Sequence, residues 1–165
     1  MLEYQPQKAF GAKLVDGGVH FRLWAPSQEQ VAVVLDNYGP SPMCKSADGW
    51  HDLMSSGPKA GTLYKFRLQN GLDVPDPASR FQPKDVHGPS EVVDPHRYKW
   101  NDSLWNGRPW EECVIYELHI GAFTQEGTFR SAIERLDYLA DLGITAIEIM
   151  PVADFPGSRN WGISL

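Results

Sequence analysis

Apolar and polar residues alternate over short runs in the first part of the chain, which predicts β-strands. Residues 19–23 and 64–68 carry apolar side chains at every second position, the period of a strand with one buried face. Residues 31–35 are almost entirely apolar, so we expect a strand buried on both faces. The pair Asn70-Gly71 is a tight-turn signal. The pattern predicts an antiparallel, immunoglobulin-like β-sandwich over residues 1–73.

Residues 74–110 differ from this pattern because they are rich in proline and tryptophan. Proline lacks a backbone N–H and therefore interrupts β-ladders. Ser-Gly repeats are scarce, and apolar residues are spread through the segment, so an ordered connector is predicted rather than a flexible linker.

The apolar pattern changes period in residues 111–165. Residues 113–120 read as a strand, and Thr128 is a good helix N-cap. Residues at helical spacing follow and are expected to pack on the sheet: Phe129, Ile133, Leu136 and Ala140. Gly143 would end the helix, and residues 144–150 read as a second, buried strand. This β-α-β order predicts parallel strands with a right-handed crossover. About 250 residues are needed to close a (β/α)8 TIM barrel, so we expect an incomplete one.

Charge and composition narrow the function. The chain has 165 residues and a net charge of −6, which argues against nucleic acid and anionic membranes as partners. Residues 1–15 lack a secretory signal pattern, so a cytoplasmic location is expected. Cys44 and Cys113 are expected to be reduced, and the sequence has no phosphate loop or metal-ligand cluster. We therefore predict no cofactor and no metal.

Aromatic residues are plentiful, and six of them are tryptophans. A flat aromatic face can cover the C–H face of a sugar ring. Trp24, Tyr38 and Trp50 could bind an α-glucan on the sandwich, or they could fill cores.

Two carboxylates lie near the ends of the predicted parallel strands. Glu117 and Glu148 could form a catalytic acid–base pair, or they could belong to a buried hydrogen-bond network, which we favour. His119 shares a strand face with Glu117, so a structural hydrogen bond competes there with general acid–base catalysis.

Several motifs together resemble one enzyme family. Residues 21–26 read FRLWAP and residues 75–83 read PDPASRFQP, as in the β-sandwich of glycogen-branching and related enzymes of the alpha-amylase superfamily. Residues 86–90 read VHGPS and residues 114–121 read VIYELHIG, which narrows the resemblance to malto-oligosyltrehalose trehalohydrolases. Residues 146–157, AIEIMPVADFPG, are similar to the family's second barrel strand and following loop.

The resemblance implies a retaining glycoside hydrolase that releases trehalose from malto-oligosyltrehalose. Such enzymes use two carboxylates about 5 Å apart, one as nucleophile and one as acid and base. In this superfamily they lie on later barrel strands that this sequence lacks, so we assign no catalytic residue and expect an N-terminal part that is inactive alone. The alternatives are a branching or debranching enzyme, a stand-alone α-glucan-binding module and a non-functional remnant.

Substrate contacts are expected in the loop after the second barrel strand. Asp154, Asn160 and Trp161 would border the substrate cleft of a complete barrel, although structural roles are open to each. The family continues with a sugar-stacking tyrosine after Asn-Trp-Gly, and Ile163 stands at that position here.

Overall fold

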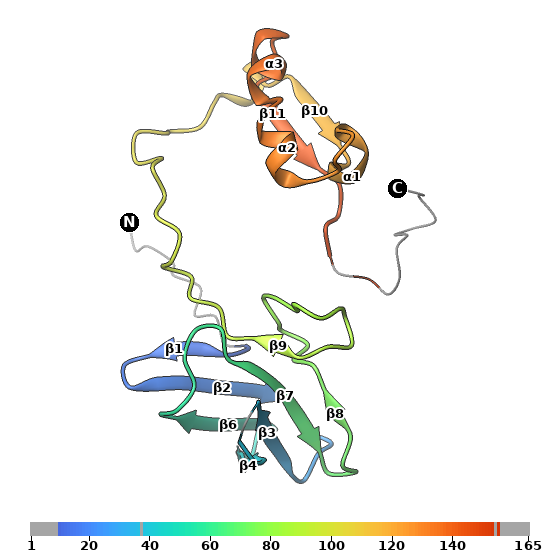
Figure 1. Ribbon diagram of the computed structural model, residues 1–165. Coiled ribbons are helices and arrows are strands. Elements are labelled where there is room, and N and C mark those ends of the chain that lie inside the picture. The colour runs from blue at the N-terminus through green and yellow to red at the C-terminus, as the bar shows by residue number, and fades with distance from the viewer. Residues whose placement is uncertain (1–9, 37, 154, 156–165) are drawn as a thin grey trace. The chain divides into compact units, whose positions relative to one another are not determined.

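The computed structural model describes residues 10–36, 38–153 and 155, and the chain divides into two compact units. Unit 1 is Met1–Lys99 and unit 2 is Trp100–Leu165 (Figure 1). Each unit is described by itself.

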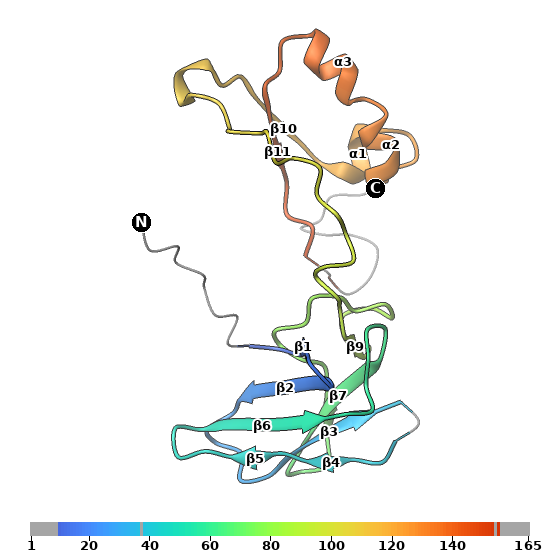
Figure 2. The same cartoon turned by 90° about the vertical axis from the view of Figure 1, so that its left-hand side faces the viewer.

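Unit 1 consists of two antiparallel sheets. The first has the order β1-β2-β6-β5, with β1 at Lys13–Val15, β2 at Gly18–Trp24, β5 at Cys44–Lys45 and β6 at Trp50–Ser55. The second has the order β4-β3-β7-β8, with β4 at Ser41–Pro42, β3 at Val31–Leu35, β7 at Leu63–Leu68 and β8 at Asp73–Val74. A further short strand, β9 at Ser90–Glu91, pairs with β7. Figure 2 shows β2 and β6 side by side in the first sheet.

The core of unit 1 lies between these sheets and follows the alternation in the sequence. Phe21 and Phe66 are fully buried, and the ring of Phe21 meets that of Tyr64 edge to face at 5.0 Å. Aromatic side chains from β2 and β7 therefore join the two sheets into a sandwich.

The expectation that residues 31–35 are buried on both faces is wrong. Val31, Val33 and Leu35 are buried, whereas Ala32 and Val34 are half-buried. Only one face of a sandwich strand meets the core, so the branched side chain of Val34 covers the outer surface.

A buried polar network fastens the proline-rich segment to the sandwich. The Tyr64 hydroxyl donates a hydrogen bond of 2.7 Å to Asp76 Oδ2, and Ala78 N donates one of 2.8 Å to Asp76 Oδ1. Asp76 N donates to Ser90 Oγ at 3.0 Å. Burial raises the pKa of the Tyr64 hydroxyl, and the adjacent Asp76 raises it further. Burial also raises the pKa of the Asp76 carboxyl, and its hydrogen bonds partly oppose this.

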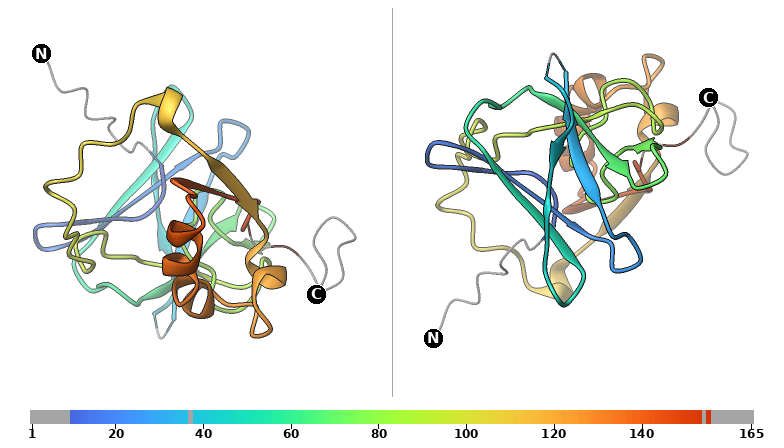
Figure 3. Two further views of the ribbon diagram at one scale, coloured as in Figure 1. Left: turned by 90° about the horizontal axis from the view of Figure 1, so that it is seen from above. Right: turned by 90° about the horizontal axis from the view of Figure 1, so that it is seen from below.

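Unit 2 contains two parallel strands joined by short helices. After a 3₁₀ turn at Trp110–Glu112 come β10 at Ile115–Leu118, α1 at Ile120–Phe123, α2 at Phe129–Ile133, α3 at Leu136–Asp141 and β11 at Ala146–Ile149. The strands pair in parallel, as predicted, with Glu117 opposite Glu148. The left-hand view of Figure 3 shows the helices beside this strand pair.

The predicted single helix is divided into α2 and α3. Arg135 has φ −104° and ψ 0°, and its N–H bonds Ala132 O at 3.0 Å, three residues back, in a tighter turn than the α-helix. The predicted core stripe is wrong for all four of its members, since Phe129, Ile133, Leu136 and Ala140 are exposed. Ala132 and Leu139 are buried instead, because the break turns the helical faces and two strands offer little surface to cover.

Among the residues described, no helix is long and apolar enough to cross a membrane. Both cysteines are free.

Candidate functional site

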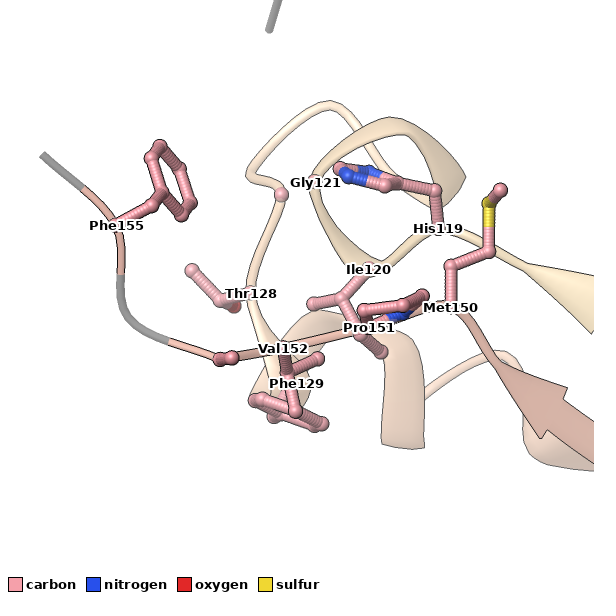
Figure 4. Close-up of a pocket in the computed structure, with 11 residues that line it drawn as sticks. His119, Ile120, Gly121, Thr128, Phe129, Met150, Pro151, Val152 and Phe155 are labelled. Carbon is pink, nitrogen blue, oxygen red and sulfur yellow. The ribbon is translucent and has the colours of Figure 1, made fainter. Parts of the chain in front are cut away.

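A pocket of about 390 Å³ lies where the carboxyl ends of β10 and β11 meet the segments that follow them. Parallel α/β enzymes place their binding loops at this edge of the sheet. Three segments contribute the lining: residues 119–121 after β10, residues 127–129 at the start of α2, and residues 150–153 with 155 after β11 (Figure 4).

Backbone pairing fixes the base of this pocket. Met150 N donates to Leu118 O at 3.0 Å, which extends the β10–β11 ladder by one residue beyond β11. His119 then caps α1, and its carbonyl accepts hydrogen bonds of 3.0 Å from the N–H groups of Ala122 and Phe123. His119 and Met150 therefore sit at the same end of the strand pair, as Figure 4 shows.

The His119 ring supplies a polar atom in a largely apolar pocket. Its Nδ1 is buried and has no hydrogen-bond partner within the described residues. A buried polar atom without a partner costs about 1–3 kcal/mol. A ligand hydroxyl that reached Nδ1 would remove this cost. The structural bond to Glu117 considered from the sequence is not formed among the described residues.

A hydrogen-bonded turn holds the second wall. Thr128 caps α2, as predicted, since its Oγ1 accepts from Ser131 N at 3.2 Å while Ser131 Oγ accepts from Thr128 N at 3.2 Å. Ser131 Oγ also lies 2.6 Å from Thr124 Oγ1. Gly127 has a φ of +61°, and an added Cβ would lie 3.0 Å from Gly121 O, so glycine is needed at this position. The wall is thus formed before any ligand arrives.

The remaining lining is apolar and partly open to solvent. Phe129 and Val152 are exposed, and Phe155 adds a third apolar side chain. Such surfaces suit the C–H faces of a sugar ring.

Glu117 and Glu148 stand outside this pocket. They occupy opposite positions on neighbouring parallel strands, so both carboxylates lie on the same face of the sheet, and both are exposed. Within the described chain neither carboxylate makes a hydrogen bond or ion pair, so the buried network favoured from the sequence is not formed. Both carboxylates face solvent, and the different environments that acid–base pairs require are not provided.

The predicted substrate contacts Asp154, Asn160 and Trp161 fall outside the described residues. Phe155, in the same predicted loop, does line the pocket. The sequence interpretation did not single out Thr128, Val152 or Phe155 as lining residues. Their position just after strand ends or before a helix was the available signal.

The aromatic candidates of unit 1 lie in two different places. Trp24 and Trp50 are cross-strand partners on β2 and β6, whereas Tyr38 follows β3.

Among the described residues no cluster of three metal-ligating side chains occurs.

Comparison with known proteins shows the family to which this chain belongs. Residues 9–95 match carbohydrate-binding module 48, described as the isoamylase N-terminal domain. This chain belongs to that family. The match begins before β1 and ends after β9, so it includes the strand at Ser90–Glu91 and the buried Asp76 network of this module.

The similarity continues beyond the module. A malto-oligosyltrehalose trehalohydrolase of Saccharolobus solfataricus is 47% identical over 153 residues, which are 93% of this chain and 27% of that protein. One from Deinococcus radiodurans is 43% identical over 163 residues, covering 97% of this chain and 26% of its own. The resemblance inferred from the motifs is therefore confirmed.

A solved structure extends the comparison to three dimensions. A protein from Salmonella typhimurium, named as a candidate alpha amylase, superposes with a TM-score of 0.88 at 51% identity, over 94% of this chain and 26% of that one. The chain with its module thus spans about a quarter of the length of each of these proteins.

Proposed function

We propose that this chain forms the N-terminal part of a glycoside hydrolase that releases trehalose from malto-oligosyltrehalose. The observation that carries the proposal is the identity of 43–47% to two trehalohydrolases over nearly the whole chain. That similarity runs through both units, so the proposal does not depend on the carbohydrate-binding module alone.

Residues 111–165 would begin the (β/α)8 barrel of this enzyme. The parallel pairing of β10 with β11, with helices between them in the sequence, supports this assignment. Residues 1–73 would be the sandwich and residues 74–110 the connector. The apolar face of the sheet, which carries Leu118 and Ile149, would be covered by further helices of the barrel.

The reaction would be hydrolysis of the α-1,4 bond that joins the malto-oligosaccharide to its terminal trehalose unit. One carboxylate attacks the anomeric carbon while a carboxylic acid protonates the leaving trehalose oxygen, and water then hydrolyses the glycosyl ester with the second group as base. We assign neither role to Glu117 or Glu148, which are both exposed to solvent.

The pocket at the end of β10 and β11 would form part of the wall of the glucan cleft. His119 Nδ1 would bond a sugar hydroxyl, and Phe129 and Val152 would contact ring carbons. Asp154, Asn160 and Trp161 follow the same strand and remain proposed substrate contacts.

A chimera tests this function. Residues 10–153 would replace the aligned segment of the Deinococcus radiodurans enzyme, and trehalose release from malto-oligosyltrehalose would be measured. We expect release to be retained, and His119→Ala to raise KM about tenfold through one lost hydrogen bond. His96→Ala, at an exposed position, is the matched control and should change neither constant. A folded chimera that releases no trehalose contradicts the proposal.

A further inference from the structure

Asparagine is followed directly by glycine at two places in the sequence, Asn70-Gly71 and Asn106-Gly107. Such pairs are prone to deamidation, because the backbone nitrogen of the second residue can attack the side-chain amide carbon of the asparagine. Glycine has no side chain to hinder that approach and gives the backbone the freedom that it needs. The residue that follows is the same in both pairs, so the structure around each pair decides whether it reacts.

The pair at Asn70 lies in the turn between β7 and β8, where hydrogen bonds hold both reacting groups. Gly71 N donates to Leu68 O at 2.9 Å, so the attacking nitrogen is already engaged. Leu72 N donates to Asn70 Oδ1 at 3.0 Å, which holds the side-chain amide in the turn. Leu68 N donates to Leu72 O at 2.9 Å across the same turn. Attack of Gly71 N on the amide would therefore have to break at least two of these bonds.

The strands on either side keep this turn closed. Arg67 on β7 makes two hydrogen bonds to Asp73 on β8, from Nε to Oδ1 at 2.7 Å and from Nη2 to Oδ2 at 2.8 Å. The same two residues are partners in the ladder between the strands. A paired arginine and carboxylate of this geometry restrain both strand ends, so the turn opens rarely.

The pair at Asn106 lies in a segment of unit 2 that forms neither helix nor strand, since the next element is the 3₁₀ turn that begins at Trp110. Among the residues that the structure describes, the N–H of Gly107 has no hydrogen-bond partner. The Asn106 side chain makes one exposed bond, from Nδ2 to Leu104 O at 3.2 Å. The attacking nitrogen is therefore free, and one bond to the leaving group must break.

Exposure to water does not distinguish the two pairs, because all four residues are exposed. The difference lies in the hydrogen bonds of the attacking nitrogen and in the restraint of the backbone around it. A hydrogen-bonded turn resists the rotation that brings the backbone nitrogen onto the side-chain carbon, whereas an unpaired segment allows it.

We propose that Asn106 is a site of spontaneous deamidation and that the hairpin protects Asn70 from the same reaction. Gly107 N loses its proton and attacks Asn106 Cγ, the bond from Cγ to Nδ2 breaks, and Nδ2 takes up a proton and leaves as ammonia. Water then opens the cyclic imide. Addition of water at Cγ gives aspartate, and addition at the backbone carbonyl carbon gives isoaspartate, in which the chain runs through Cγ. One water is consumed and one ammonia is released.

Either product changes the segment that leads into β10. A new carboxylate arises two residues before Arg108, whose Nη1 lies 3.9 Å from Glu112 Oε2. Isoaspartate also inserts one further carbon into the backbone. The modification therefore alters both the charge and the length of this segment without any enzyme.

Incubation of the 165-residue chain in mildly alkaline buffer, followed by peptide mass spectrometry over time, tests the proposal. We expect the Asn106 peptide to convert about tenfold faster than the Asn70 peptide, a ratio that corresponds to about 1.4 kcal/mol, because more bonds must break at Asn70. Aspartate and isoaspartate peptides, separated by chromatography, should both form. In denaturant the hairpin is lost, so the two rates should converge. Asn106→Gln should abolish the product at that position, because the longer side chain closes an imide ring far more slowly.

Three results would overturn the proposal. The first is conversion of Asn70 at least as fast as that of Asn106 in the folded chain. The second is a difference between the two rates that persists in denaturant, because neighbouring residues in the sequence would then be its cause. The third is a product at Asn106 that contains aspartate alone, since direct hydrolysis of the amide, and not the imide, would then be the route. None of these measurements depends on the proposed enzymatic function.

Discussion

Removal of one hydroxyl, in Tyr64→Phe, tests the role of the buried network of unit 1. Tyr64 and Asp76 are 2% and 3% exposed, and the Tyr64 hydroxyl is the side-chain donor to Asp76 Oδ2. Phenylalanine keeps the ring contacts with Phe21 and Phe66, so the change removes the donor and little packing. An unsatisfied buried acceptor costs about 1–3 kcal/mol, and a charged one more.

The loss of stability caused by Tyr64→Phe should depend on pH. Burial holds the pKa of Asp76 above its usual range, and the Tyr64 hydrogen bond opposes that rise. Without the bond the pKa rises further, and the ionised carboxylate becomes more costly above that pKa. As the pH falls through the folded-state pKa, Asp76 is protonated and the cost is relieved. The destabilisation should therefore be larger at pH 7 than at about pH 4.

Hydrogen exchange at the amides of β3 and β7 measures this effect within unit 1 alone. Tyr38→Phe is the matched control, because Tyr38 is 60% exposed and its change should stay within about 0.5 kcal/mol. Equal protection in the two variants, or a loss for Tyr64→Phe that grows as the pH falls, would refute the reasoning.

Three further changes test unit 2. Gly127→Ala should destabilise it by about 1–2 kcal/mol, since φ is +61° and the new Cβ would crowd Gly121 O; exchange at β10 and β11 reports this, and unchanged protection would contradict it. Thr128→Ala should cost about 1 kcal/mol through the lost cap, whereas Thr128→Ser should restore most of it in the same measurement. Glu148→Gln should stabilise the strand pair by about 0.2–1 kcal/mol, because it removes repulsion with Glu117, and a gain that survives molar salt would argue against this cause.

The sequence predicted those elements whose pattern is local. Alternation in β2 and β7 identified the buried faces, because a strand with one face in the core must repeat every two residues. Thr128 identified the start of α2, and Gly143, with a φ of +94°, identified the end of α3. The parallel pairing of β10 and β11 followed from their order in the β-α-β pattern.

Features that depend on distant parts of the chain could not be predicted in the same way. β9 lies among prolines, and it forms only because β7 offers an open partner there. The bond from Tyr64 to Asp76 joins the core to a segment that reads as a connector. The break at Arg135 could not be predicted, because no glycine or proline stands there. The half-buried outer face of β3 reflects the sandwich as a whole.

The candidate sites also combine features that follow from local sequence with features that depend on distant parts of the chain. Trp24 and Trp50 are candidates from the sequence because they are aromatic, but only the register of β2 with β6 places them opposite each other. The pocket of unit 2 was expected after the second parallel strand, where Val152 and Phe155 lie. That His119 Nδ1 is buried without a partner can be recognised only from the three-dimensional structure.

The most direct test of the central claim is product analysis. The chimera that carries residues 10–153 in the Deinococcus radiodurans enzyme would be incubated with maltopentaosyltrehalose, and its products separated by chromatography. The account predicts trehalose and maltopentaose in equal amounts, with none formed by the 165-residue chain alone. A folded chimera that yields branched glucan, or no trehalose while the parent enzyme is active, would contradict it.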